Sequence, residues 1–393
     1  MVEGTATLVV DLGNSETRVK TYFGRTQKGN LRTKISQLSN AFGSSMDGEV
    51  WARVKGNSEY NEDNSRILLL NGSRYCTGLM QQSEFSGVSF VPTAGEKKYE
   101  SLSTKLALHN AFLQGYEDIA SWTKSDINSI NVVWNVTVLL PAEDLDNGAE
   151  RLAAMIREVK EINFEMPSVQ RDIKIDTVNV LPEGFCALLG VIFQSCGVIR
   201  EGYEDMMDKD TYTLIVDIGA GTTDISIARG GAVISNSRYS ETVGGNNVQK
   251  LVRGMLRQKG YNKLSEESFK KACETGTLRV GAQRIQIFEE LNSAKSEIAV
   301  QLVNAIKTYL ELNVIPIQEI SYLLVCGGGA ITNEDVKELT PISNYLVDFL
   351  RKQSAGIELV ELPMVEIEGE MKKVSPRMLN IIGAGVASES LMA

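Results

Sequence analysis

The sequence predicts an α/β protein built from two similar lobes. Three observations lead to this prediction. The chain has 393 residues, which is long for one ordinary domain and suits two. A strand–turn–strand motif occurs twice, starting at residues 7 and 213. Segments with the pattern of strands also alternate with segments with the pattern of helices, an order typical of α/β architecture.

The repeated motif is the most informative feature. Residues 7–20 read TLVVDLGNSETRVK and residues 213–226 read TLIVDIGAGTTDIS. Each copy is an apolar strand that ends in Asp-apolar-Gly, followed by small polar residues, a Thr and alternating apolar positions. Because the alternation after the turn has period two, each unit is predicted to be a β-hairpin. This excludes a P-loop or a dinucleotide-binding fingerprint, in which a helix must follow the turn.

The remaining segments can be placed around the two hairpins. The first lobe is expected to hold helices near 101–122 and 147–161, strands at 131–141 and 173–181, and a helix from 183. The second is expected to hold helices near 246–260, 265–273 and 283–312, a strand at 322–326 and a closing helix that begins at Pro376. The polar stretch 26–100 has no pattern that we can assign.

The boundary between the lobes is predicted within residues 200–210, an acidic run without a strand or helix pattern. We therefore expect lobe I at 1–205 and lobe II at 206–375, with the closing helix, 376–393, returning to lobe I.

Composition excludes several classes of protein. The net charge of −10 argues against direct nucleic-acid binding, which needs a basic face. The five cysteines lack CxxC spacing and the chain has a single histidine, which argues against a zinc site. Dispersed thiols suit a reducing compartment, and neither a signal-peptide pattern nor an apolar run of transmembrane length is found. We expect a cytoplasmic protein without membrane contact.

Each hairpin turn offers what a nucleoside triphosphate needs. Tight turns rich in glycine expose backbone N–H donors without side-chain obstruction. A carboxylate beside phosphate is favourable when Mg²⁺ lies between them, and Mg²⁺ is commonly held by one or two carboxylates. We therefore predict that Asp11 and Asp217 hold a hydrated Mg²⁺ from opposite sides. The turn residues predicted to bind phosphate are Gly13, Asn14 and Ser15, with Gly219, Gly221, Thr222 and Thr223.

Each of these turns, taken alone, could be an ordinary hairpin turn. Two copies in matched strand contexts favour the nucleotide site. Two further glycine segments, Gly327 to Gly329 after a buried strand and Gly244, Gly245 and Asn246 before a helix, could let a nucleotide approach the backbone. Glycines after a strand also serve packing alone. Glu183 opens a helix, where a carboxylate is favoured by the helix dipole, or it points into the cleft and orients water.

Five segments, taken in chain order, resemble the superfamily of actin, heat-shock chaperone and sugar-kinase ATPases. The resemblance lies in the segments 10–15, 181–190, 216–224, 324–330 and 379–385, which resemble the phosphate 1, connect 1, phosphate 2, adenosine and connect 2 motifs. It implies a two-lobed actin-like (ribonuclease H-like) ATPase fold with a nucleotide in the interlobe cleft.

Within this superfamily the sequence is most similar to the bacterial plasmid-segregation actins of the ParM type. This resemblance implies ATP-driven assembly into filaments that move DNA through an adaptor protein. It also implies that Asp11 and Asp217 serve the metal, that Asp217 and Glu183 are catalytic, and that Glu183 positions the attacking water. The segments 244–246 and 327–329 would line the nucleoside. Lys295 and Ser296 resemble the helix that meets adenine and ribose, although a solvated helix face is the alternative.

Other functions on the same fold remain open. In a small-molecule kinase, Asp217 would take the proton of a substrate hydroxyl. A carboxylate at Glu183 suits water activation and favours hydrolysis instead. A chaperone is disfavoured because no peptide-binding segment follows Ala393, and a membrane-tethered division protein because the last residues form too short an amphipathic segment. The sequence does not separate ATP from GTP, or plasmid DNA from phage or other cargo.

Overall fold

The structure is a computed structural model. It describes residues 2–13, 16–26, 31–40, 42–44, 66–77, 89–90, 97–264, 266–330, 336–354, 356–367 and 370–392. Two of the residues predicted to bind phosphate, Asn14 and Ser15, lie outside the described residues, as does much of the stretch 26–100.

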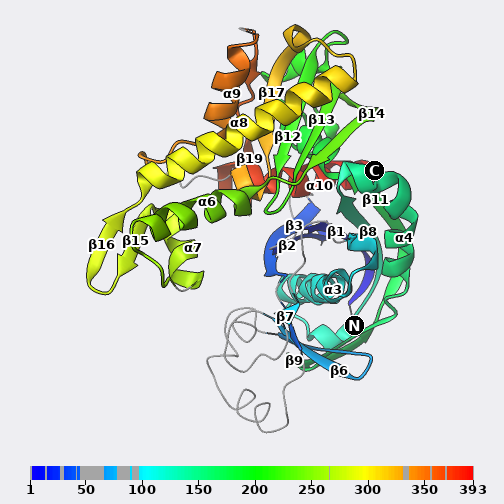
Figure 1. Cartoon of the computed structure of the whole chain (residues 1–393). Coiled ribbons are helices and arrows are strands. Elements are labelled where there is room, and N and C mark those ends of the chain that lie inside the picture. Colours follow the sequence, from blue (N-terminus) through cyan, green and yellow to red (C-terminus); the bar gives the residue numbers. More distant parts are fainter. Residues whose placement is uncertain are drawn as a thin grey trace.

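Two five-stranded sheets with equivalent strand orders form the two lobes (Figure 1). The first has the order β11-β8-β1-β2-β3 and the second β14-β13-β12-β17-β18. In each sheet, three antiparallel strands continue into two parallel strands. The strands of the first are β1 (Val2–Leu12), β2 (Glu16–Arg25), β3 (Leu31–Ser39), β8 (Ile130–Leu140) and β11 (Lys174–Pro182). Those of the second are β12 (Tyr212–Ile218), β13 (Thr223–Arg229), β14 (Ala232–Glu241), β17 (Ile320–Cys326) and β18 (Glu358–Leu359).

The sequence repeat is a structural repeat. In the first hairpin Asp11 pairs across the ladder with Arg18, and in the second Asp217 pairs with Asp224. The two turns therefore connect their strands at equivalent positions of the two sheets. The predicted β-hairpins and the two-lobed α/β architecture are confirmed.

The described helices agree with the prediction, except that α8 begins later than expected and α9 was not predicted. They are α3 (Leu102–Thr123), α4 (Leu145–Arg157), α5 (Glu183–Ile192), α6 (Gly245–Gln258), α7 (Glu266–Thr275), α8 (Phe288–Leu312), α9 (Ile342–Arg351) and α10 (Leu379–Met392). The prediction of helix from residue 283 is wrong, because β15 (Thr277–Val280) and β16 (Gln283–Gln286) form a hairpin there. Its turn contains Gly281 with φ of +59°, a conformation that glycine adopts without strain.

Short 3₁₀ turns complete the connections. They are η2 (Lys98–Glu100), η3 (Ile127–Ser129), η4 (Ala142–Asp144), η5 (Ser195–Gly197), η6 (Glu204–Met207), η7 (Ile317–Glu319), η8 (Gly328–Ala330) and η9 (Pro376–Met378). The sequence predicted no strand or helix in the run 200–210, but the structure has a 3₁₀ turn there. Within it, η6 forms because Met206 is buried against the core between the sheets.

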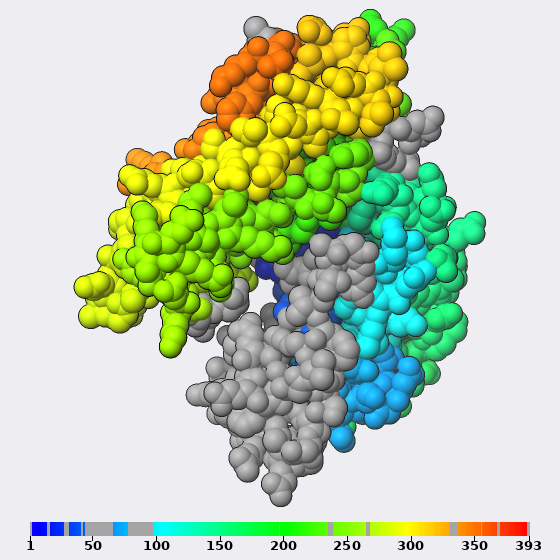
Figure 2. Space-filling view, in the orientation of Figure 1, coloured from blue at the N-terminus to red at the C-terminus, as the bar shows by residue number. Residues whose placement is uncertain are grey.

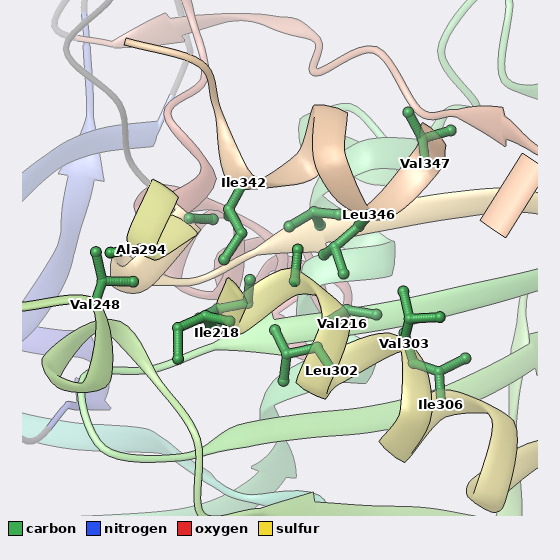
Figure 3. Packing of buried hydrophobic residues seen from close by; sticks show 14 of the residues in the cluster. Val216, Ile218, Val248, Ala294, Leu302, Val303, Ile306, Ile342, Leu346 and Val347 are labelled. Carbon is green, nitrogen blue, oxygen red and sulfur yellow. The ribbon is translucent and has the colours of Figure 1, made fainter. Parts of the chain in front are cut away.

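Each lobe has its own apolar core. In lobe II, side chains of β12 point toward α8, and side chains of α9 pack into the same cluster (Figure 3). Val216 and Ile218 contribute from the strand, Leu302 and Val303 from α8, and Leu346 from α9. The corresponding core of lobe I packs α3 against β1 and β8 around the fully buried Trp134.

A third core lies between the two sheets, where α5 packs against α10 (Figure 1). The helices approach backbone to backbone at two glycines. A Cβ at Gly383 would lie 1.7 Å from the Cys186 carbonyl oxygen, and one at Gly190 would lie 2.7 Å from the Leu379 carbonyl oxygen. These helices begin beside the predicted catalytic residues, so this close crossing positions both ends of the candidate site. α10 also contacts β1 and β8.

Part of the unassigned stretch 26–100 belongs to a further sheet. Its order is β10-β9-β5-β6-β4-β7, from β4 (Phe42–Ser44), β5 (Arg66–Leu70), β6 (Ser73–Thr77), β7 (Ser89–Phe90), β9 (Glu161–Met166) and β10 (Val169–Asp172). Arg66 of β5 is buried and donates to Asn110, Gln114 and Glu117 of α3. A small hairpin, β19 (Met364–Ile367) with β20 (Glu370–Lys373), precedes α10.

In space-filling view, residues of lobe II, coloured green to orange, lie above the cyan and teal residues of lobe I (Figure 2). Within the described part of the chain, no helix has both the length and the apolar character that crossing a membrane requires.

The single histidine makes the acid stability of lobe I testable. His109 of α3 is 8% exposed, and burial lowers its pKa from the ordinary value to about 4. The unfolded chain therefore takes up this proton first, near pH 6.5. The contribution of neutral His109 is complete above that pH and is lost as pH falls toward 4. At pH 5 the loss should be about 2 kcal/mol.

The measurement is urea unfolding of the wild type and His109→Gln at pH 7 and pH 5. The wild type should lose more stability than the variant between these pH values. Because the chain has one histidine, an NMR titration of the imidazole reads its pKa directly. A folded-state pKa near 6.5 would contradict the prediction.

Candidate active site

Four carboxylates converge where the two sheets face each other. Asp11 lies near the end of β1, Asp217 near the end of β12, Asp224 opposite it on β13, and Glu183 at the start of α5. Asp11, Glu183 and Asp217 are each no more than 9% exposed. Burial is the largest influence on the pKa of Glu183, and all three aspartates also raise it, which requires them to be close.

Two cations lie among these carboxylates. The Lys98 Nζ is 2.7 Å from the Glu183 Oε1, and the Arg18 Nη1 is 3.1 Å from the Asp11 Oδ2. Arg18 also reaches Glu16, at 3.3 Å. The four carboxylates thus outnumber the two cations, an arrangement that suits an additional cation, whose binding would favour the charged forms of the carboxylates.

The first hairpin turn is held by Asn40, which follows β3. Its amide donates to the Gly13 carbonyl oxygen, and its oxygen accepts from the Thr17 hydroxyl. The matching Thr223 in the second turn donates to the Val243 carbonyl oxygen at 2.6 Å. The second turn is closed by the Gly219 N–H, which donates to the Thr222 carbonyl oxygen at 2.8 Å. The first turn is therefore held by a side chain from outside its hairpin, and the second by its own backbone and by the bond from Thr223 to Val243.

Three glycine segments that are far apart in sequence meet beside the second turn. The Gly245 N–H donates to the Gly219 carbonyl oxygen at 2.9 Å. A Cβ at Gly244 would lie 2.8 Å from the same oxygen, and one at Gly329 would lie 2.7 Å from it. Glycine is needed at Gly244 and Gly329 because the neighbouring backbone leaves no room for a side chain.

The neighbouring residues extend this cradle. The Asn246 N–H donates to the Ala220 carbonyl oxygen at 2.7 Å. Gly327 has φ of +89°, and a Cβ there would lie 2.3 Å from the Asp217 Oδ1. The last described residues of this loop, Gly328 to Ala330, form η8. The glycine loop therefore adjoins the carboxylate cluster.

Lys295 and Ser296 lie on α8. Lys295 is buried, and its Nζ donates to the Thr340 carbonyl oxygen at 3.2 Å, in the loop before α9. Burial lowers the pKa of Lys295 to about 8. Ser296 is half-buried. The structure ties Lys295 to the loop before α9 rather than to the glycine segments, so a nucleoside contact at this pair stays a prediction.

Comparisons with known proteins agree with the fold described above. Residues 215–338 match the family model described as archaeal actin homologue MreB-like, C-terminal. No curated protein matches the chain significantly. Among solved structures, the actin-like protein Alp7A has 15% sequence identity and a TM-score of 0.68, covering 98% of this chain and 96% of its own.

Two further structures are similar over nearly their full lengths. A ParM from Clostridium botulinum, solved as a 15-stranded filament, has 16% identity and a TM-score of 0.64, covering 99% of each chain. An archaeal actin homologue in complex with ADP has 13% identity and a TM-score of 0.62, covering 99% of this chain and 100% of its own. The chain has an actin-like fold.

The residues of this actin-like chain fit a Mg-nucleotide. The buried Asp224 Oδ1 has no hydrogen-bond partner, and the glycines of the cradle carry no side chains of their own. Mg²⁺ takes few protein ligands and keeps waters or phosphate oxygens as the others. Among the described residues, no three His, Cys, Asp or Glu side chains form a metal-binding group by themselves.

The electrostatics of the actin-like site favour a proton acceptor near neutral pH. Burial raises the pKa of Glu183 to about 8, against the opposing effect of Lys98. Burial and the neighbouring Asp217 raise the pKa of Asp224 to about 7. A general base is most effective when its pKa lies near the working pH.

Sequence reasoning did not name five polar residues of the site: Arg18, Asn40, Lys98, Asp224 and Asn380. Arg18 had a usable signal, because it occupies in the first hairpin the position of Asp224 in the second. Asp224 and Asn380 lie in the recognised segments 216–224 and 379–385, and the Asn380 Nδ2 donates to the Asp217 Oδ2 at 2.7 Å. Asn40 and Lys98 lie outside these segments, and tertiary packing alone brings them to the site.

Proposed function

We propose that this protein is an ATPase that assembles into filaments in a nucleotide-dependent manner and acts in plasmid DNA segregation. The observation that carries the proposal is the convergence of Asp11, Asp217 and Glu183 beside the glycine cradle. The matching hairpins supply carboxylates from both lobes, as a metal-bound phosphate chain requires.

The roles of the residues follow from their chemistry. Asp11 and Asp217 hold the hydrated Mg²⁺, which when bound neutralises phosphate charge. Gly13, with Gly219, Gly221, Thr222 and Thr223, offers backbone and hydroxyl donors to phosphate. The segments 244–246 and 327–329 line the nucleoside, with Lys295 and Ser296 beyond them. Glu183 orients the attacking water and accepts its proton, a role that its raised pKa supports.

Self-assembly is the second part of the proposal. The similar ParM from Clostridium botulinum was solved as a filament. Head-to-tail contacts that do not close generate such open polymers. With a net charge of −10, the chain would reach DNA through an adaptor protein rather than directly. The nucleotide is ATP, with GTP as the alternative that the same cradle admits.

The test is light scattering and electron microscopy of the pure protein with Mg-ATP, with Mg-GTP and without nucleotide. Filaments are expected above a critical concentration with nucleotide only, without added lipid or substrate. A protein that stays monomeric at high concentration with Mg-ATP, and that phosphorylates a sugar or acid, would support the kinase alternative instead.

A further inference from the structure

Lys98 is a partly buried cation among the carboxylates of the site. Its side chain is 14% exposed, and its Nζ lies 2.7 Å from the Glu183 Oε1. Burial alone would lower the pKa of Lys98, but Glu183, Asp11 and Asp224 together raise it above its ordinary value. The lysine is therefore held charged by carboxylates of both lobes.

The three-residue turn η2 is anchored so that Lys98 alone faces the cluster. On one side the Lys97 Nζ is 2.6 Å from the Asp144 Oδ1. Next to Lys98, the ring of Tyr99 is buried over Gly148 of α4, where a Cβ would lie 2.3 Å from the ring. Glu100 then pairs with Arg151 of α4. The residues on both sides of Lys98 thus contact other parts of lobe I, and these contacts fix the position of Lys98.

This turn lies at the junction of the lobes. Asp144, which anchors Lys97, belongs to η4, and η4 contacts β14 of lobe II. Glu143 of the same turn is close enough to raise the pKa of Asp224 on β13. Lys98 therefore stands where the carboxylates of lobe I meet those of lobe II.

We infer that Lys98 binds the terminal phosphate of the nucleoside triphosphate and, without nucleotide, is held in place by Glu183. This inference rests on the proposed function. An ammonium group has three donors, so Lys98 can keep one bond to Glu183 and offer the others to phosphate oxygens. Asp11 and Asp217, the predicted metal ligands, lie in the same cluster, which puts the metal-bound end of the phosphate chain beside Lys98. The residue would thus distinguish a triphosphate from a diphosphate.

The test is the affinity of Lys98→Met for Mg-ATP and for Mg-ADP, measured by calorimetry. Loss of a charged hydrogen bond should weaken ATP binding about 10- to 100-fold. ADP binding should change less than about 3-fold, because the lost contact is to the third phosphate. Lys98→Arg, which keeps the charge, should recover part of the ATP affinity.

Lys105→Met is the matched control. It makes the same change at an exposed lysine of α3 and leaves the contacts that anchor η2 in place. Its ratio of ATP to ADP affinity should equal that of the wild type. If unpaired Glu183 prevents Lys98→Met from folding, the double variant Lys98→Met/Glu183→Gln removes both charges and serves instead.

The outcomes separate the inference from the proposed function. Equal weakening of ATP and ADP binding by Lys98→Met would make Lys98 a structural counterion and overturn the inference alone. A wild-type protein that binds neither nucleotide would overturn the proposed function, and the inference with it.

Discussion

Replacing Glu183 by Gln is expected to slow nucleotide hydrolysis by a factor on the order of 10² or more, the size expected for loss of a general base. Nucleotide binding and assembly should persist, because the glycine cradle and the carboxylates Asp11 and Asp217 are untouched. The amide also keeps an oxygen that can accept the hydrogen bond of Lys98. Polymers of the variant should therefore outlast those of the wild type.

The measurement is phosphate release and light scattering followed over time on the same sample. Glu143→Gln is the matched control, since Glu143 is an exposed carboxylate near the same lobe junction. It should hydrolyse and depolymerise like the wild type. Normal phosphate release by Glu183→Gln would remove this residue from the mechanism, and failure to bind nucleotide would make its role that of a helix-start residue.

The features that the sequence predicted are those that local chemistry encodes. The two hairpins were visible because an apolar strand, an Asp-apolar-Gly turn and a period-two return each leave a pattern over a few residues. The repeat also carried Asp11 and Asp217 to equivalent register positions. The helix beginning at Glu183 was predicted correctly because Pro182 precedes it and a carboxylate favours a helix start.

The features that the sequence did not predict depend on long-range contacts. Strand β5 pairs with β9, almost 100 residues away, and Arg66 donates hydrogen bonds to groups of α3. Lys98 lies in a three-residue turn whose neighbours are fixed by α4 and η4, so no local periodicity marks it. Strand β16 was predicted as the start of a helix, because its pairing with β15 is a tertiary contact that the four residues of the strand do not reveal.

Replacing Asp217 by Asn is expected to lower Mg-dependent hydrolysis at least ~10²-fold. This loss of activity should exceed the loss caused by removing a residue that only hydrogen-bonds to a metal ligand. The amide oxygen can still accept the hydrogen bond of Asn380, so the fold around the site should hold. Asp210→Asn is the control, because the Asp210 side chain is 94% exposed on the loop before β12. It should leave hydrolysis unchanged.

Without metal and nucleotide, Asp217→Asn should be more stable than the wild type. Burial is the main cause that raises the pKa of Asp217, and the nearby Asp11 raises it further, so the native site holds a carboxylate in an environment that disfavours its charge. Removing that charge should raise Tm by about 2 °C, the shift that ~1 kcal/mol produces in a protein of moderate size. Thermal unfolding in EDTA and in Mg-ATP measures both states. The wild type should gain stability from Mg-ATP and the variant much less. If the variant is less stable than the wild type in EDTA, Asp217 stabilises the fold. The prediction is instead that Asp217 binds a cation and lowers the stability of the protein without that cation.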